Sequence, residues 1–125
     1  MPSRAEPMVV CVPPVLTGLM WPHVGPHITK RLISAEGDLK AAAERMVDLA
    51  HQVVDGDRQL WAVMADDKVA TAWTTAIEAD PRVLVINGIT QEDVQQYGHL
   101  IKNAMVSFAQ AEGCTSSRVE QGRAA

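Results

Sequence analysis

The apolar residues of this chain change their spacing twice, and this change constrains the fold more than any other feature. Between residues 38 and 54 they recur at the spacing of one helix face. Between residues 60 and 86 they form strand-like runs separated by short turns. Helical spacing returns between residues 90 and 112. This order predicts a mixed α/β (α+β) fold, with helices packed on a sheet.

Five strands are predicted, and their connections indicate how they pair. Their ranges are Met8–Val12, Leu60–Ala65, Lys68–Glu78, Arg82–Ile86 and Thr115–Glu120. Short turns join the middle three strands, which predicts an antiparallel meander. A helix precedes the last strand, so that strand should lie parallel to the fourth. Period-two alternation puts one set of side chains of the third strand on a single face: Val69, Thr71, Trp73 and Thr75.

Capping residues delimit two of the helices. Asp38 is a good N-cap for a helix that ends before Gly56. Thr90 and Asp93 have the spacing of a capping box at the start of the last helix. The first helical region is expected to begin near Pro14, to kink between residues 21 and 26 because of two prolines, and to resume as a second short turn.

Length and charge exclude several classes of protein. A chain of 125 residues fits one domain, predicted as residues 8–125 after a flexible arm, 1–7. A net charge of -4 without a Lys/Arg cluster argues against nucleic acid as a partner. The N-terminus does not read as a secretory signal, and the proline-interrupted apolar stretch 8–19 is too short to span a membrane. Cys11 and Cys114 are interpreted as reduced thiols in a cytoplasmic protein.

Three segments carry a resemblance to a known family. They are Trp21-Pro22-His23-Val24, Leu60-Trp61-Ala62-Val63 and the run from Phe108 to Cys114, followed by a terminal Gly122-Arg123. In this order they resemble small GNAT-like (Gcn5-related N-acetyltransferase fold) proteins of phages and prophages. The resemblance implies a β-α-α-β-β-β-α-β order with a mixed, mostly antiparallel sheet, in a form truncated after the fifth strand.

The segment between the fourth strand and the last helix departs from what the family resemblance implies. Such enzymes hold the CoA pyrophosphate there, on backbone N–H groups of a glycine-rich loop. This chain has only Gly88 in that loop, with no Lys or Arg nearby in sequence, and places Glu92 and Asp93 in the first helical turn. These carboxylates suit the helix dipole and would repel a pyrophosphate. Tyr97, the only tyrosine, lies in an apolar stripe and is assigned to the core.

The departures favour a non-catalytic binding or structural protein of a phage, located in the virion or in an assembly. It would have no catalytic residues, no cofactor and no metal, and would associate with itself or with capsid, portal or tail proteins. The residues predicted to interact are Val9, Val10, Val12, Leu16, Ser117, Val119 and Gln121. The alternative is a small acetyl-CoA-dependent N-acetyltransferase with a cofactor site at Ile86, Gly88 and Gln91.

Two histidines in the first helical region are a further candidate for chemistry, as metal ligands. His23 and His27 are four residues apart, a spacing that can place two ligands on one helix face. Zinc needs a third protein ligand, and Pro26 interrupts the helix between them. They are therefore interpreted as surface or kink-capping residues.

Overall fold

The structure is a computed structural model that describes residues 6–120, apart from the side chains of Ala35 and Glu36. Its elements follow the predicted order, with one 3-10 turn, Pro14–Leu16, before the first helix. They are β1 (Met8–Val12), α1 (Thr17–Glu36), α2 (Leu39–Val54), β2 (Gln59–Ala65), β3 (Lys68–Glu78), β4 (Val83–Asn87), α3 (Gln91–Ala111) and β5 (Ser116–Glu120). The flexible arm predicted at the N-terminus lies mostly outside the described residues.

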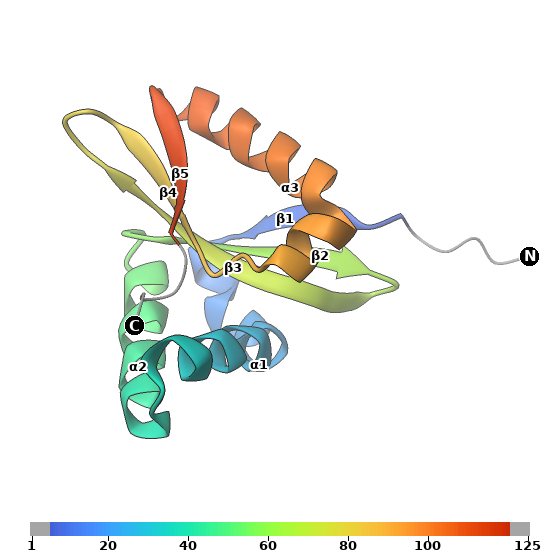
Figure 1. The fold of residues 1–125 in the computed structure, drawn as a ribbon, viewed down its shortest axis with the longest axis vertical. Coiled ribbons are helices and arrows are strands. Elements are labelled where there is room, and N and C mark those ends of the chain that lie inside the picture. Colours follow the sequence, from blue (N-terminus) through green and yellow to red (C-terminus); the bar gives the residue numbers. More distant parts are fainter. Residues whose placement is uncertain (1–5, 121–125) are drawn as a thin grey trace, which may run out of the picture.

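One five-stranded sheet forms the middle layer of the molecule, in the order β1-β2-β3-β4-β5. The pairs from β1 to β4 are antiparallel, and β4 pairs with β5 in parallel. Helix α3 covers one face of the sheet, while α1 and α2 lie on the other (Figure 1). The predicted fold class is confirmed. None of the helices between residues 6 and 120 combines the length and hydropathy that a membrane span requires.

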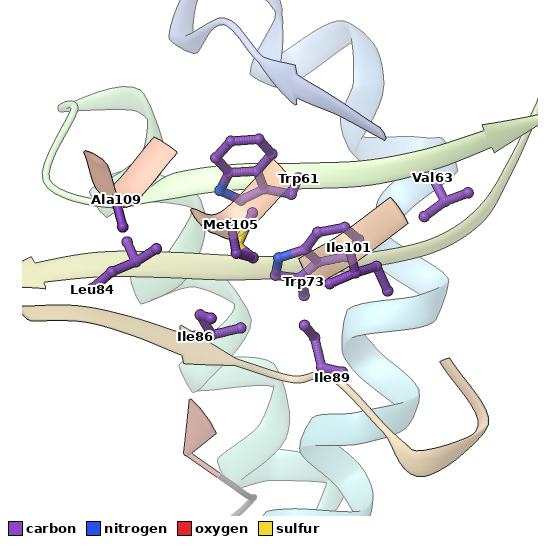
Figure 2. Close-up of a cluster of buried hydrophobic side chains, with 9 residues drawn as sticks. All are labelled: Trp61, Val63, Trp73, Leu84, Ile86, Ile89, Ile101, Met105 and Ala109. Carbon is purple, nitrogen blue, oxygen red and sulfur yellow. The ribbon is translucent and has the colours of Figure 1, made fainter. Parts of the chain in front are cut away.

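Each face of the sheet has its own apolar core. The core under α3 includes Trp61 and Trp73, which are paired across β2 and β3, together with Met105 of the helix (Figure 2). The two indole rings stack with centroids 6.3 Å apart and planes 7° apart. Phe108 packs edge-on against Trp61 at 5.1 Å. Both tryptophans thus pack against α3.

The expected break in the first helical region is wrong, because α1 is one helix of 20 residues with Pro22 and Pro26 inside it. A proline deprives the carbonyl four residues earlier of its N–H partner. The carbonyls affected are those of Gly18 and Pro22. Gly18, Pro22 and Pro26 are all exposed, so water can satisfy these groups. The helix therefore tolerates both prolines on its solvent side.

The prediction that Val69, Thr71, Trp73 and Thr75 share one face of the third strand is also wrong in part. Val63 pairs with Thr71 whereas Met64 pairs with Val69, so Ala70 is an extra residue opposite this pair. Such a bulge interrupts the alternation of side chains. As a result Val69 packs into the core against α1 and α2, whereas Trp73 packs under α3.

Local capping signals were predicted correctly. The Asp38 side chain accepts a hydrogen bond from the Lys40 N–H at the start of α2. Thr90 and Asp93 form both hydrogen bonds of a capping box at the start of α3. Asp66 and Asp67, with φ of 52° and 63°, form the tight turn between β2 and β3. These short-range interactions determine where the elements begin and turn.

Candidate functional site

A pocket of about 820 Å³ opens where β4 ends and α3 begins. This volume is within the usual range for small-molecule sites. We call it the β4–α3 pocket. It arises because β4 pairs with β3 only from Thr74 to Glu78, so the other half of β3 has no sheet partner on that side among the described strands. Lining residues that carry polar side chains are His27, Lys30, Arg31, Ser34, Arg45, Arg58, Thr71, Trp73, Thr74, Asn87, Thr90, Gln91, Glu92, Asp93, Gln96, Tyr97 and Glu120.

Arg31 of α1 fills the space beside the unpaired half of β3. Its Nη1 donates to the carbonyl of Ala72 at 2.6 Å, and its Nη2 donates to Thr71 Oγ1 at 2.6 Å. Nη2 also lies 2.8 Å from Oδ2 of Asp93, with which it forms an ion pair. Burial lowers the pKa of Arg31, and the charges of Asp93 and Glu92 oppose that shift. Arg31 thus joins α1, β3 and α3 at the pocket wall.

The first turn of α3 is less repulsive to an anion than its sequence indicates. Asp93 is buried and its charge is compensated by Arg31, which is 62 residues away in sequence. A cation therefore lies at this turn, although no Lys or Arg is nearby in sequence. The capping box uses the N–H groups of Thr90 and Asp93. Within residues 6–120 the N–H groups of Gln91 and Glu92 have no partner, as the first N–H groups of a helix usually lack one.

Gly88 gives this loop its shape. Its φ of +91° lies in the left-handed region, which residues other than glycine rarely adopt. A Cβ at this position would lie 3.8 Å from Arg31 Cδ and 3.9 Å from Trp73 Cβ. The glycine therefore keeps bare backbone at the floor of the pocket, next to Arg31.

Two further arginines lie on the α2 side of the pocket. Arg58 is held by neutral groups: Nε donates to Gln52 Oε1 at 2.9 Å, and Nη1 donates to Asn87 Oδ1 at 3.0 Å and to Thr74 Oγ1 at 3.3 Å. Burial lowers its pKa, the charge of Arg45 lowers it further, and the charge of Glu120 opposes both. This wall of the pocket is consequently electropositive.

Two residues that line the pocket contain a buried side-chain nitrogen without a hydrogen-bond partner in the described part of the chain. Three buried side-chain polar atoms have no partner within the described residues, and two of them, Arg31 Nε and Trp73 Nε1, belong to residues that line it. His27 also lines the pocket, and its Nε2 lies 3.2 Å from the carbonyl oxygen of Val69. In the neutral ring, donation from Nε2 leaves Nδ1 as a proton acceptor. His27 therefore places an imidazole in the pocket lining.

The residues proposed for a cofactor site divide between core and pocket. Gly88 and Gln91 line the pocket, whereas the Ile86 side chain is buried under α3 (Figure 2). Tyr97 is half-buried against the same core and also reaches the pocket. Arg31 and Arg58 were not predicted, because their roles depend on partners far away in sequence. His27 was interpreted as a surface or kink-capping residue, but it is half-buried and lines the pocket.

The residues proposed for interaction lie on the two outer strands of the sheet and on the turn after β1. Val9 and Val10 of β1 are half-buried, Val12 is buried, and Leu16 is exposed. Ser117 and Val119 belong to β5, in which every residue is exposed. Gln121 lies outside the described residues. Association through either outer strand stays a prediction.

The two histidines of α1 do not belong to a metal-like cluster. Among the side chains that the structure describes, no group of three or more His, Cys, Asp or Glu is arranged to hold a metal ion. His27 lines the β4–α3 pocket, while His23 lines a separate small cavity between α1 and the β2–β3 turn. Cys11 and Cys114 are free thiols, as predicted.

Comparisons with known proteins were made by sequence and by structure. No family model and no curated protein matches the sequence. The structure is similar to a predicted acetyltransferase with acetyl-CoA from Clostridium acetobutylicum, with 12% identity, a TM-score of 0.62 and coverage of 94% of this chain and 82% of that one. It is similar to a GCN5-related N-acetyltransferase from Ralstonia eutropha, with 13% identity, a TM-score of 0.63 and coverage of 94% and 84%.

A third neighbour is AAC(6')-Iy in complex with the bisubstrate analogue CoA-S-monomethyl-acetylneamine, with 15% identity, a TM-score of 0.63 and coverage of 94% and 80%. At such identities the likeness shows the fold alone, which is the acetyltransferase fold expected from the resemblance. The main functional prediction, a non-catalytic phage structural protein, is contradicted, because the neighbours described are acetyltransferases. The comparisons favour the alternative, a small N-acetyltransferase.

Proposed function

We propose that this chain is a small acetyl-CoA-dependent N-acetyltransferase that uses the β4–α3 pocket. The observation that supports this most strongly is the position of the pocket, at the junction of β4 and α3 in an acetyltransferase fold. Its volume of about 820 Å³ can hold part of an acetyl-CoA molecule. The proposal concerns the reaction class and leaves the acceptor amine open.

The residues present fit an acyl-CoA in three respects. Gly88 keeps bare backbone at the pocket floor. The N–H groups of Gln91 and Glu92 remain available at the positive end of the α3 dipole. The Arg45 and Arg58 side chains bring positive charge to the pocket lining, which suits the phosphates of CoA. The Asp93 carboxylate does not oppose binding, because Arg31 already compensates its charge.

These residues divide the work between binding and proton transfer. Acetyl-CoA supplies an activated acetyl thioester when bound. Gly88, Gln91 and Glu92 would hold its polar groups through their backbone, and Arg31 fixes the wall beside them. An amine must lose a proton as it becomes an amide, and the imidazole of His27, which lines the pocket, would accept it. His27 is thus the proposed general base.

The reaction itself can be tested on the full chain. The purified protein is incubated with acetyl-CoA and a panel of primary amines: free amino acids, peptides with free N-termini, polyamines and an aminoglycoside. Release of free CoA thiol and the mass of the product are followed. We expect thiol release that depends on both protein and amine. A folded protein that releases no thiol with any amine of the panel contradicts the proposal.

The role of His27 has a matched control on the same helix. His27→Asn should lower kcat at least tenfold and remove the rise of activity with pH that a histidine base confers. His23→Asn changes a histidine one helical turn away that does not line this pocket, and should leave kcat within twofold. Equal activities of the two variants would remove His27 from the mechanism.

The phage-type origin and the truncation implied by the family resemblance stay predictions. Genes for terminase, portal or tail proteins beside the gene for this chain would support the origin. Self-association is likewise a prediction, and sedimentation of the purified chain tests it.

A further inference from the structure

The arginines of the described residues divide into two groups by their partners. Arg31, Arg82 and Arg118 each lie within 4.0 Å of a carboxylate oxygen. Arg45 and Arg58 have no such partner among the side chains that the structure describes, although both are half-buried. These two line the same wall of the β4–α3 pocket. The arginines without a carboxylate partner therefore lie together at this pocket.

The guanidinium of Arg58 is fixed in position without being neutralised. Gln52, Thr74 and Asn87 hold its Nε and Nη1 through neutral oxygen atoms. Its Nη2 has no hydrogen-bond partner among the described residues. It is not among the buried unsatisfied atoms, so this end of the group remains accessible. A held guanidinium with one free end is organised in advance for an incoming acceptor.

The neighbourhood of Arg58 raises the cost of leaving this charge unpaired. The charge of Arg45 is close enough to lower the pKa of Arg58, in addition to the effect of burial. The opposing acid, Glu120, already accepts hydrogen bonds from Arg118 and from Asn87. Two half-buried like charges without a counter-ion are unfavourable unless a ligand supplies one. Arginine pairs are well suited to carboxylate and phosphate groups.

We propose that Arg45 and Arg58 form an oxyanion site that binds a carboxylate or phosphate group of the ligand in the β4–α3 pocket. The identity of the anion rests on the proposed function, because the anion would belong either to CoA or to the acceptor amine. Anion binding by the two arginines does not depend on catalysis.

The first experiment tests anion binding alone. Inorganic pyrophosphate and citrate are titrated into the full chain at low ionic strength by calorimetry, because salt screens such contacts. Arg45→Gln and Arg58→Gln should each weaken binding at least tenfold. Arg82→Gln is the matched control, since Arg82 is exposed and paired with Glu112 away from the pocket, and its binding should stay within twofold. Equal affinities for all four proteins overturn the proposal.

A second variant separates loss of charge from loss of folding. Arg58→Lys keeps the charge and should recover part of the affinity that Arg58→Gln loses, with thermal unfolding followed for both. If Arg58→Lys binds no better than Arg58→Gln while both are folded, the charge is not the cause and the proposal fails.

Two further titrations identify the source of the anion. CoA is compared with S-acetylpantetheine, which lacks the phosphates, in the wild type and in Arg58→Gln. A tenfold loss for CoA alone assigns the site to a CoA phosphate. If CoA binding is unchanged, kcat/KM should fall for an acidic acceptor and not for its amide, which assigns the site to the acceptor. If neither changes, the proposal is overturned. If no CoA binds but pyrophosphate still requires Arg58, the proposed function fails and the anion site remains.

Discussion

The Nη2 atom of Arg31 lies 2.8 Å from Oδ2 of Asp93, and this single ion pair joins the two sides of the candidate pocket. The partners come from α1 and from the first turn of α3, 62 residues apart. Their side chains are 19% and 9% exposed, so the pair is largely withdrawn from water. The same Oδ2 accepts the Thr90 N–H, which couples the capping of α3 to the position of α1.

Removing the charge of Asp93 should therefore destabilise the whole fold. Asp93→Asn leaves the Arg31 guanidinium largely buried without its counter-ion and weakens the capping box. We expect the free energy of unfolding to fall by about 2–3 kcal/mol. Glu92→Gln changes an exposed carboxylate of the same turn and should stay within about 0.5 kcal/mol of the wild type. Urea denaturation measures both, and equal losses would contradict this role for the ion pair.

A substitution at Gly88 tests whether the pocket floor depends on a left-handed residue. Gly88→Ala forces a Cβ onto a φ of +91° and should cost about 1–2 kcal/mol. Gly18→Ala is the control, because Gly18 lies in α1 with no atom within 4 Å of an added Cβ. It should raise stability by about 0.5 kcal/mol. Thermal unfolding distinguishes the two, and a neutral Gly88→Ala would mean that the loop relaxes freely.

The stacked tryptophans give a comparison between two substitutions of the same type. Trp61 Nε1 donates to Thr75 Oγ1 at 2.9 Å, whereas Trp73 Nε1 has no partner in the described part of the chain. Trp61→Phe loses a buried hydrogen bond, while Trp73→Phe removes an unsatisfied donor. We expect Trp61→Phe to be the more destabilising of the two by about 1 kcal/mol in urea denaturation. The reverse order would show that Trp73 Nε1 is satisfied, for instance by bound water.

Glu120 should make a small, pH-dependent contribution to stability. Hydrogen bonds from Arg118 and then from Asn87 hold the pKa of Glu120 below its usual value of 4.5. Because the pKa of Glu120 is lowered in the folded state, its contribution to stability is fully present above pH 4.5. That contribution is lost as the pH falls through the folded pKa. The difference in urea midpoint between wild type and Glu120→Gln should shrink on acidification. A difference that does not vary with pH would remove Glu120 from the acid sensitivity of the fold.

Features set by neighbouring residues were predictable from sequence. The capping box of Thr90 and Asp93, the N-cap at Asp38 and the strand bounds depend on residues a few positions apart. Two predictions failed because the outcome depended on more than the local pattern. The prolines of α1 are tolerated because they lie on its solvent side, and the face of Val69 depends on a bulge opposite β2.

The candidate site was less predictable because its contacts join distant segments. Gly88 and Gln91 were found from the loop pattern, and both line the pocket. The carboxylate of Asp93 was interpreted as repulsive, since its partner Arg31 is 62 residues away and no local pattern brings them together. Arg58 could not be singled out either, because its setting depends on Asn87 from another strand. Only the assembled fold shows which charges are compensated.

The binding of acetyl-CoA to the full chain tests the central claim most directly. Isothermal titration calorimetry and thermal unfolding are performed with acetyl-CoA, with CoA and with adenosine diphosphate as a control for its nucleotide part. We expect saturable binding of one acetyl-CoA per chain, and a melting temperature that rises with ligand concentration because only the folded state binds. No heat of binding and an unchanged melting temperature at millimolar acetyl-CoA would contradict it.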